Sequence, residues 1–117
     1  MKSHIAILAF AALLAASVRA DAHAMLDHAS PAVGSTVGSS PKEIVLSFTE
    51  QLEPKFSGVE VRNANGGAVT SGSSHASGTE MRVALKPLSA GAYKVIWHAL
   101  SVDTHRTNGS FSFRVGP

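Results

Sequence analysis

An aspartate and a histidine lie two residues apart near the end of the chain, at Asp103 and His105. In an extended segment, residues at this spacing point to the same side, so the pair can offer one carboxylate oxygen and one imidazole nitrogen to a single metal ion. The same two residue types are also an ordinary pair on a surface loop. The pair therefore indicates a metal site only if further ligands come from elsewhere in the chain.

His23 can supply such ligands if it is the first residue of the mature protein. Its α-amine and its own Nδ1 can then bind one metal ion together. With Asp103 and His105 they form a set of nitrogen and oxygen ligands that suits Cu(II), which prefers tetragonal sites of this kind. Zn(II) can use the same atoms but favours a tetrahedral arrangement. The fold would have to bring the N-terminus to the loop that carries Asp103 and His105.

The N-terminal residues are typical of an export signal. Residues 5–16 are apolar, follow Lys2 and precede a region rich in small residues. This run has the length of the h-region of a signal peptide and is shorter than the ~20 residues of a membrane-spanning helix. We therefore expect a signal peptide over residues 1–22 and an exported domain over residues 23–117.

Three cleavage positions satisfy a small-x-small rule, and they leave Asp21, His23 or Met25 as the first residue. The cut after Ala22 is the strict A-x-A match that retains His23. The cut that leaves Asp21 first would create a different copper site. Histidine would then be the third residue and could bind Cu(II) locally, through the amine, two deprotonated amides and the imidazole, without Asp103 or His105.

The composition excludes several classes of function. The 117-residue chain has no cysteine, which excludes thiol catalysis, zinc–thiolate sites and disulfides. It contains 10 Lys+Arg and 8 Asp+Glu, and removing Lys2, Arg19 and Asp21 leaves 8 against 7. A net charge so close to zero argues against nucleic-acid binding. The mature region has no long apolar run, so we expect no membrane span.

Short runs of alternating apolar and polar residues predict an all-β fold. Their number and spacing favour an antiparallel Greek-key β-sandwich of about seven strands, with a small closed barrel as the alternative. The expected strands are 43–48, 59–62, 81–85, 92–99 and 110–115, with weaker ones near 25–29 and 68–70. Residues 101–109 are expected to form a hairpin loop, and residues 63–79 a hairpin turn, a short strand and a mobile loop.

The mature region resembles the CopC family of periplasmic copper-binding proteins. The resemblance rests on His23 and on motifs in the family's order, which are Ser30-Pro31-Ala32-x-Gly34-Ser35, Phe48-Thr49-Glu50-Gln51-Leu52, Phe56-Ser57-Gly58, Leu88-Ser89-Ala90-Gly91-x-Tyr93-x-Val95-x-Trp97, Ser101-x-Asp103-x-His105 and Gly109-Ser110-Phe111-x-Phe113. It implies a cupredoxin-like or Ig-like β-sandwich. It also implies one Cu(II) ion held by His23, Asp103 and His105, and a role in copper homeostasis or resistance, with delivery to an inner-membrane permease of the CopD type.

The chain also departs from the family pattern. Some members carry a methionine-rich loop that binds Cu(I), whereas residues 63–79 contain no methionine and a single histidine, His75. Thioether sulfur is the soft ligand that Cu(I) prefers, so we expect a protein that binds Cu(II) alone. Members commonly have proline after the histidine of the Asp-x-His motif, where this chain has Arg106.

Several other residues admit two interpretations. Glu50 is either an auxiliary carboxylate near the metal or a solvated acid at a strand end. His28 is expected on the surface, and His98 is expected to be half exposed on its strand, with support of a metal ligand as the alternative. Met25 and Met81 are expected in the core.

The sequence favours a monomeric copper carrier over an enzyme, because it contains no serine nucleophile elbow, no paired catalytic carboxylates and no phosphate-binding loop. Two alternatives remain at this point. One is a copper oxygenase of the histidine-brace class, which uses a similar grouping of an amine and two imidazoles. The other is an Ig-like exported structural module that binds no metal.

Overall fold

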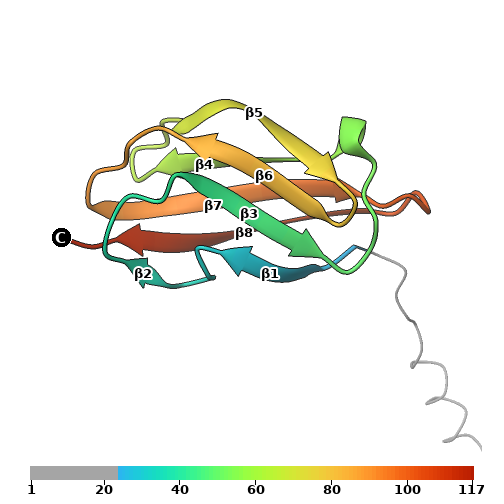
Figure 1. Ribbon diagram of the computed structural model, residues 1–117, viewed down its shortest axis with the longest axis horizontal. Helices are drawn as coiled ribbons and strands as arrows, with labels where there is room; N and C mark the ends of the chain where they lie inside the picture. The colour runs from blue at the N-terminus through green and yellow to red at the C-terminus, as the bar shows by residue number, and fades with distance from the viewer. Residues whose placement is uncertain (1–23) are drawn as a thin grey trace, which may run out of the picture.

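The computed structural model describes residues 24–117, which form two four-stranded β-sheets packed face to face (Figure 1). The first sheet has the strand order β1-β3-β6-β5, and every neighbouring pair in it is antiparallel. Its strands are β1 (Leu26–Ser30), β3 (Glu43–Phe48), β6 (Glu80–Leu85) and β5 (Thr70–Ser77).

The second sheet has the order β2-β8-β7-β4 and contains the longest strands. Its strands are β2 (Thr36–Val37), β8 (Arg106–Val115), β7 (Gly91–Leu100) and β4 (Gly58–Asn63). The two-residue strand β2 pairs in parallel with β8, whereas the β7–β8 and β4–β7 pairs are antiparallel. A short 3-10 helix, η1 (Pro54–Phe56), precedes β4. The predicted all-β sandwich is confirmed, with eight strands in the described residues.

The core lies between the two sheets and follows the alternation in the sequence. In β7 the side chains of Tyr93, Val95 and Trp97 are buried, while Lys94 and His98 on the other face are exposed. The same pattern buries alternate residues of β3, β6 and β8. Since successive side chains of a strand point to opposite faces, this alternation explains why the strands form where they were predicted.

Two segments differ from the sequence-based expectation. Residues 70–77 form the full strand β5, where a short strand and a mobile loop were expected. Apart from His75, its side chains are small, and most of its residues are exposed, so no apolar alternation marks it. Its pairing with β6 is irregular between Ser71 and His75. Strand β8 begins at Arg106, so Asn108 and Gly109 belong to the strand and the loop is shorter than predicted.

Gly109 is required within β8 because the ring of Trp97 on β7 fills the space of a side chain. A Cβ added at Gly109 would lie 2.7 Å from Cζ2 of Trp97. The Trp97 ring also packs edge-on against Phe48 of the opposite sheet, with ring centroids 5.0 Å apart. A glycine that predicts a turn in the sequence is therefore used here for close packing between neighbouring strands.

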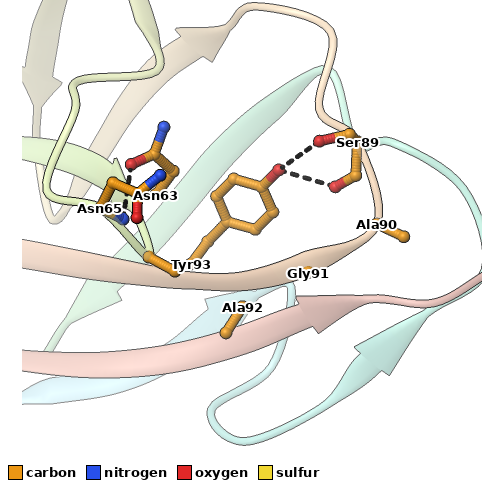
Figure 2. A pocket seen from close by; sticks show the side chains of 8 residues that line it. Asn63, Asn65, Ser89, Ala90, Gly91, Ala92 and Tyr93 are labelled. Atoms are coloured by element: carbon orange, nitrogen blue, oxygen red, sulfur yellow. Dashed lines mark hydrogen bonds between the residues drawn. The ribbon is translucent and has the colours of Figure 1, made fainter.

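The start of β7 is held by the hydroxyl of Tyr93, which donates a hydrogen bond to the carbonyl of Ser89 at 2.6 Å. Figure 2 shows this contact beside the Asn63–Asn65 turn, in a hollow that both segments line. This hollow lies at the opposite end of β7 from the loop that follows Leu100.

No helix in residues 24–117 is long and apolar enough to cross a membrane.

Candidate metal centre

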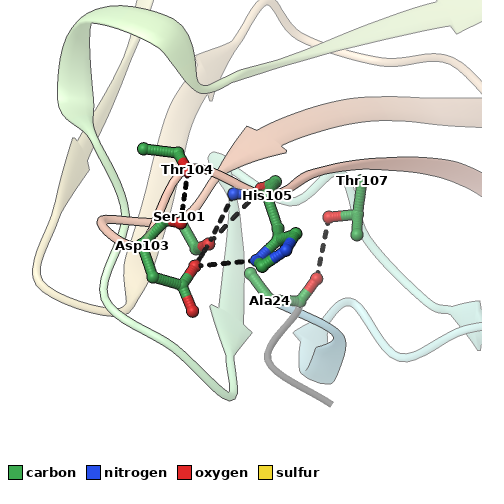
Figure 3. Close-up of polar contacts among 6 residues, drawn as sticks. All are labelled: Ala24, Ser101, Asp103, Thr104, His105 and Thr107. Atoms are coloured by element: carbon green, nitrogen blue, oxygen red, sulfur yellow. Dashed lines mark hydrogen bonds and ion pairs between the residues drawn. The ribbon is translucent and has the colours of Figure 1, made fainter. Parts of the chain in front are cut away.

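Asp103 and His105 lie in the loop that joins β7 to β8, at one end of the sandwich. Nδ1 of His105 is 3.3 Å from Oδ1 of Asp103, and the two side chains are 49% and 45% exposed. Figure 3 shows the imidazole of His105 between the carboxylate of Asp103 and the backbone of Ala24. The structure therefore brings together the two ligands that were expected in this loop, within reach of solvent.

Ser101 forms the base of this loop. Its hydroxyl donates a short hydrogen bond to Oδ1 of Asp103, and the backbone N–H of His105 donates to the hydroxyl oxygen at 3.3 Å. The backbone N–H of Ser101 donates to the carbonyl of His105 at 3.0 Å, and the N–H of Thr104 donates to the carbonyl of Ser101 at 2.8 Å. These bonds close the loop in one conformation.

The same contacts lower the pKa of Asp103. The hydrogen bond from Ser101 is the largest cause, partial loss of hydration opposes it, and the contact with His105 lowers the pKa further. A hydrogen bond to the charged form of a carboxyl stabilises that form. Asp103 is therefore ionised at neutral pH, which is the state in which a carboxylate binds a metal ion.

The N-terminal segment of the described chain is attached beside this loop. Ala24 is completely buried, and its carbonyl accepts a hydrogen bond from Oγ1 of Thr107 at 2.8 Å. The N–H of Met25 donates to Oγ1 of Thr49 at 2.9 Å, and the N–H of Thr49 donates to the carbonyl of Met25 at 3.0 Å. Residue 24 is thereby held near His105, at the start of β8.

His23, the remaining expected ligand, lies outside the described residues, as do residues 1–22. Within residues 24–117 there is no group of three or more His, Cys, Asp or Glu side chains that could hold a metal ion. In this part of the chain, Asp103 and His105 are two candidate ligands that need others to complete a site.

Glu50 is the residue that was considered as an auxiliary carboxylate. Glu50 is partly buried and lies between Thr49, which bonds Met25, and Gln51, whose carbonyl accepts the N–H of Val102 at 3.0 Å. It therefore lies at the same end of the sandwich as the loop.

His28 on β1 and His98 on β7 are both exposed, in line with the surface positions expected for them. The ring of His98 covers Gly58, where an added Cβ would lie 3.1 Å from Cε1 of the ring. Of the two methionines expected in the core, Met81 is buried, but Met25 is 53% exposed. The prediction for Met25 was wrong because this residue precedes β1 at the open end of the sandwich.

Sequence reasoning missed two residues that shape the centre, Ser101 and Thr107. Ser101 was noted only as part of the Asp-x-His motif, and Thr107 was not singled out. The one available signal was their position, two residues before Asp103 and two residues after His105.

The fold and the Asp–His loop define a β-sandwich with a candidate metal centre at one end, and comparison with known proteins gives the family. The model of the CopC domain matches residues 26–116. The chain is 40% identical over 116 residues to copper resistance protein C of Pseudomonas syringae pv. tomato, covering 91% of this chain and 90% of that protein.

Two further comparisons agree. The crystal structure of CopC from Methylosinus trichosporium OB3b superposes with a TM-score of 0.76 at 30% identity, over 81% of this chain and 95% of that one. The copper transport protein CutJ of Bacillus subtilis is 31% identical over 99 residues, which are 81% of this chain but 18% of CutJ. The chain belongs to the CopC family, as its resemblance to that family suggested. The matched region of the family model begins after His23.

Proposed function

We propose that this protein binds one Cu(II) ion through His23, Asp103 and His105, and carries it in the periplasm as part of copper resistance or homeostasis. Membership of the CopC family and the likeness to proteins named for copper resistance support a copper-binding role. The observation that carries the proposed site is the hydrogen bond from Thr107 to the carbonyl of Ala24, because it holds the residue after His23 beside the Asp103–His105 pair.

The chemistry of the ligands favours Cu(II). Adjacent Cα atoms are about 3.8 Å apart, so a residue directly before the anchored Ala24 can reach the loop. An N-terminal His23 would add its α-amine and Nδ1 to an imidazole and a carboxylate. Cu(II) binds such nitrogen and oxygen sets more tightly than other divalent first-row metals do. His105 can offer a ring nitrogen to the ion that Asp103 also binds once its contact with Oδ1 of Asp103 is released.

This arrangement suits a carrier that holds and releases the ion, and we propose no catalytic step. The expected signal peptide, residues 1–22, would direct export, and its cleavage would create the α-amine ligand. Glu50 is proposed as an auxiliary carboxylate because its backbone neighbours connect to Met25 and Val102. The absence of methionine from residues 63–79 supports a site for Cu(II) rather than Cu(I).

The N-terminus and the loop can be tested by two changes. Adding one residue before His23 removes the chelate of the amine and Nδ1, and His105→Ala removes a ligand from the loop. Removing a residue that only orients a metal ligand typically weakens metal binding ~10–100-fold. Each of these changes removes a ligand itself, so each should weaken Cu(II) binding by more than that. Competition titration of the exported, processed protein measures the affinity, and His75→Ala, at an exposed histidine of β5, is the matched control.

The intact mass of the exported protein, with and without copper, reports the cleavage site and the metal content together. If the protein begins at Asp21 and His105→Ala leaves Cu(II) binding intact, copper is bound by the local tripeptide and the proposed site is wrong.

We further propose delivery to a copper-transporting membrane protein of the CopD type. Support comes from CutJ, a longer copper transport protein of which this chain matches a minor part. Three large apolar side chains are also exposed near the loop, namely Met25 at 53%, Phe56 at 54% and Val102 at 49%. Helix η1, which carries Phe56, lies beside the end of β7 because the N–H of Glu53 donates to the carbonyl of Leu100.

Transfer of copper to membrane vesicles containing such a transporter tests this step. Phe56→Ser and Val102→Ser should slow transfer without weakening Cu(II) binding. Val33→Ser is the matched control, because Val33 is 60% exposed but lies in the connection between β1 and β2. Equal transfer rates for all three variants would argue against docking through this end.

A further inference from the structure

Ser101 is the only polar or charged residue among residues 24–117 that is buried, with 0% of its surface exposed. It lies directly after β7, which ends at Leu100, and four residues before His105. Burying a hydroxyl costs free energy unless its hydrogen bonds are made inside the protein. The partners of Ser101 therefore indicate what its burial achieves.

The hydroxyl of Ser101 contacts both proposed loop ligands. It has one hydrogen to donate, and Oδ1 of Asp103 accepts it. Its oxygen accepts the N–H of His105 at 3.3 Å. One buried atom thus fixes the carboxylate of Asp103 and the backbone of His105 at the same time.

The backbone between these ligands adopts an uncommon conformation. Thr104 has a φ of 72°, in the left-handed region that residues other than glycine rarely adopt. Such a conformation persists only where the surrounding contacts determine it. Here those contacts come from Ser101, which bonds Thr104 and His105 through its backbone and Asp103 through its hydroxyl.

We propose that Ser101 is a positioning residue that sets the geometry of the copper site before copper binds. Its hydroxyl holds Oδ1 of Asp103, which leaves Oδ2 as the oxygen that can coordinate copper without breaking the contact. Ser101 is not itself a ligand, since it is fully buried beneath the loop. This inference rests on the proposed function, because it assigns Asp103 and His105 as ligands.

A site arranged in advance avoids the entropy cost of ordering its ligands when the ion binds. The side chains of Asp103 and His105 are almost half exposed, so without Ser101 they would sample several rotamers. Loss of the hydroxyl should therefore weaken Cu(II) binding and make the coordination geometry heterogeneous.

Ser101→Ala tests the proposal, with Ser57→Ala as the matched control. Ser57 also lies at this end of the sandwich, where its hydroxyl hydrogen-bonds the backbone of Leu100 and accepts the N–H of that residue at 3.0 Å. We expect Ser101→Ala to weaken Cu(II) binding about 10–100-fold, in the range for residues that orient metal ligands, and Ser57→Ala to leave it unchanged.

The electron paramagnetic resonance spectrum of bound Cu(II) separates positioning from a general loss of stability. Ser101→Ala should give a broadened or mixed spectrum, while Ser57→Ala should give the spectrum of the natural protein. Ser101→Thr and Ser101→Val form a second pair, of equal shape, in which only threonine keeps the hydroxyl. Threonine should bind copper more tightly than valine. Equal affinities and identical spectra within both pairs would overturn the proposal.

A measurement on the unaltered, copper-free protein covers the case in which the variants do not fold. Backbone 15N relaxation should give order parameters near the ~0.85 of rigid backbone for Thr104 and His105, because Ser101 holds the loop before copper arrives. Values below about 0.6 would show a flexible loop and refute positioning by Ser101. This result does not depend on copper binding, so it distinguishes failure of the positioning role from failure of the proposed function.

Discussion

At the scale of single residues, the protonation states of the proposed ligands determine how copper binding depends on pH. Amine and imidazole nitrogens bind a metal ion only when they are deprotonated, so protons compete with Cu(II) for them as the pH falls. The hydrogen bond from Ser101 lowers the pKa of Asp103, so this carboxylate stays ionised between pH 5 and 8. Cu(II) affinity should therefore decline progressively as the pH falls from 8 to 5, because protons compete with copper for the nitrogen ligands and not for Asp103.

Competition titrations between pH 5 and 8 check this expectation. An affinity that does not change over this range would exclude the proposed ligand set. The contribution of Asp103 to the stability of the fold changes only at much lower pH. Because its pKa in the folded protein lies below the reference value of about 3.9, its ionised form stabilises the fold above that pH, and this contribution is lost as pH falls through the lowered pKa.

The candidate ligands were easier to identify in the sequence than the residues that contact them. Asp103 and His105 were identifiable because their types and spacing suit a metal ion. Ser101 and Thr107 act through hydrogen bonds that form only in the folded protein. Serine and threonine are common in loops and strands, so their types alone indicate no such role.

At the scale of secondary-structure elements, Thr107 connects β8 to the segment before β1. Thr107→Val keeps the shape of the side chain but removes the hydroxyl that bonds the carbonyl of Ala24. We expect weaker Cu(II) binding, because Ala24, the residue after His23, would no longer be held beside the loop, while the sandwich stays folded. Thr107→Ser, which keeps the hydroxyl, is the control. If valine and serine variants bind copper equally, the anchor does not position His23.

The packing of β7 against β8 gives a prediction about stability. Gly109→Ala would place a methyl group 2.7 Å from the ring of Trp97, which is itself packed against Phe48. Overpacking of this kind typically costs about 1–3 kcal/mol. Urea unfolding should show this loss. The control is Gly38→Ala, where no atom lies within 4 Å of the added Cβ. Equal stability of the two variants would mean that the Trp97 ring shifts at little cost.

Most strands that bury one face were predicted almost to their ends, because a half-buried strand has alternating apolar and polar residues in its sequence. Strand β5 was not, since its exposed serines and glycine carry no such pattern and its pairing partner, β6, is what defines it. The extension of β8 back to Arg106 was missed for a related reason. Asn108 and Gly109 favour turns locally, but they pair with His98 and Trp97 of β7.

At the scale of the whole molecule, the sandwich separates a well-packed interior from an end that presents the candidate metal centre. Figure 1 shows that β1 begins at the end where β7 finishes and β8 starts. Two segments distant in the sequence, the one before β1 and the β7–β8 loop, therefore lie at the same end of the sandwich. Copper bound there would link His23 to the β7–β8 loop. The hydrogen bond from Thr107 of β8 to Ala24 would then be a second connection at this end of the sandwich.

This link predicts that Cu(II) stabilises the whole domain against unfolding. A ligand at 100 times its Kd adds about 2.7 kcal/mol if it binds only the folded state. A domain of this size gains about 4–8 °C in Tm per kcal/mol, so Cu(II) should raise Tm by about 10–20 °C. Differential scanning calorimetry measures the shift. His105→Ala should lose most of it, whereas His75→Ala should keep it. An equal rise in both variants would place copper away from the β7–β8 loop, because only a site that includes His105 couples the loop to the N-terminus.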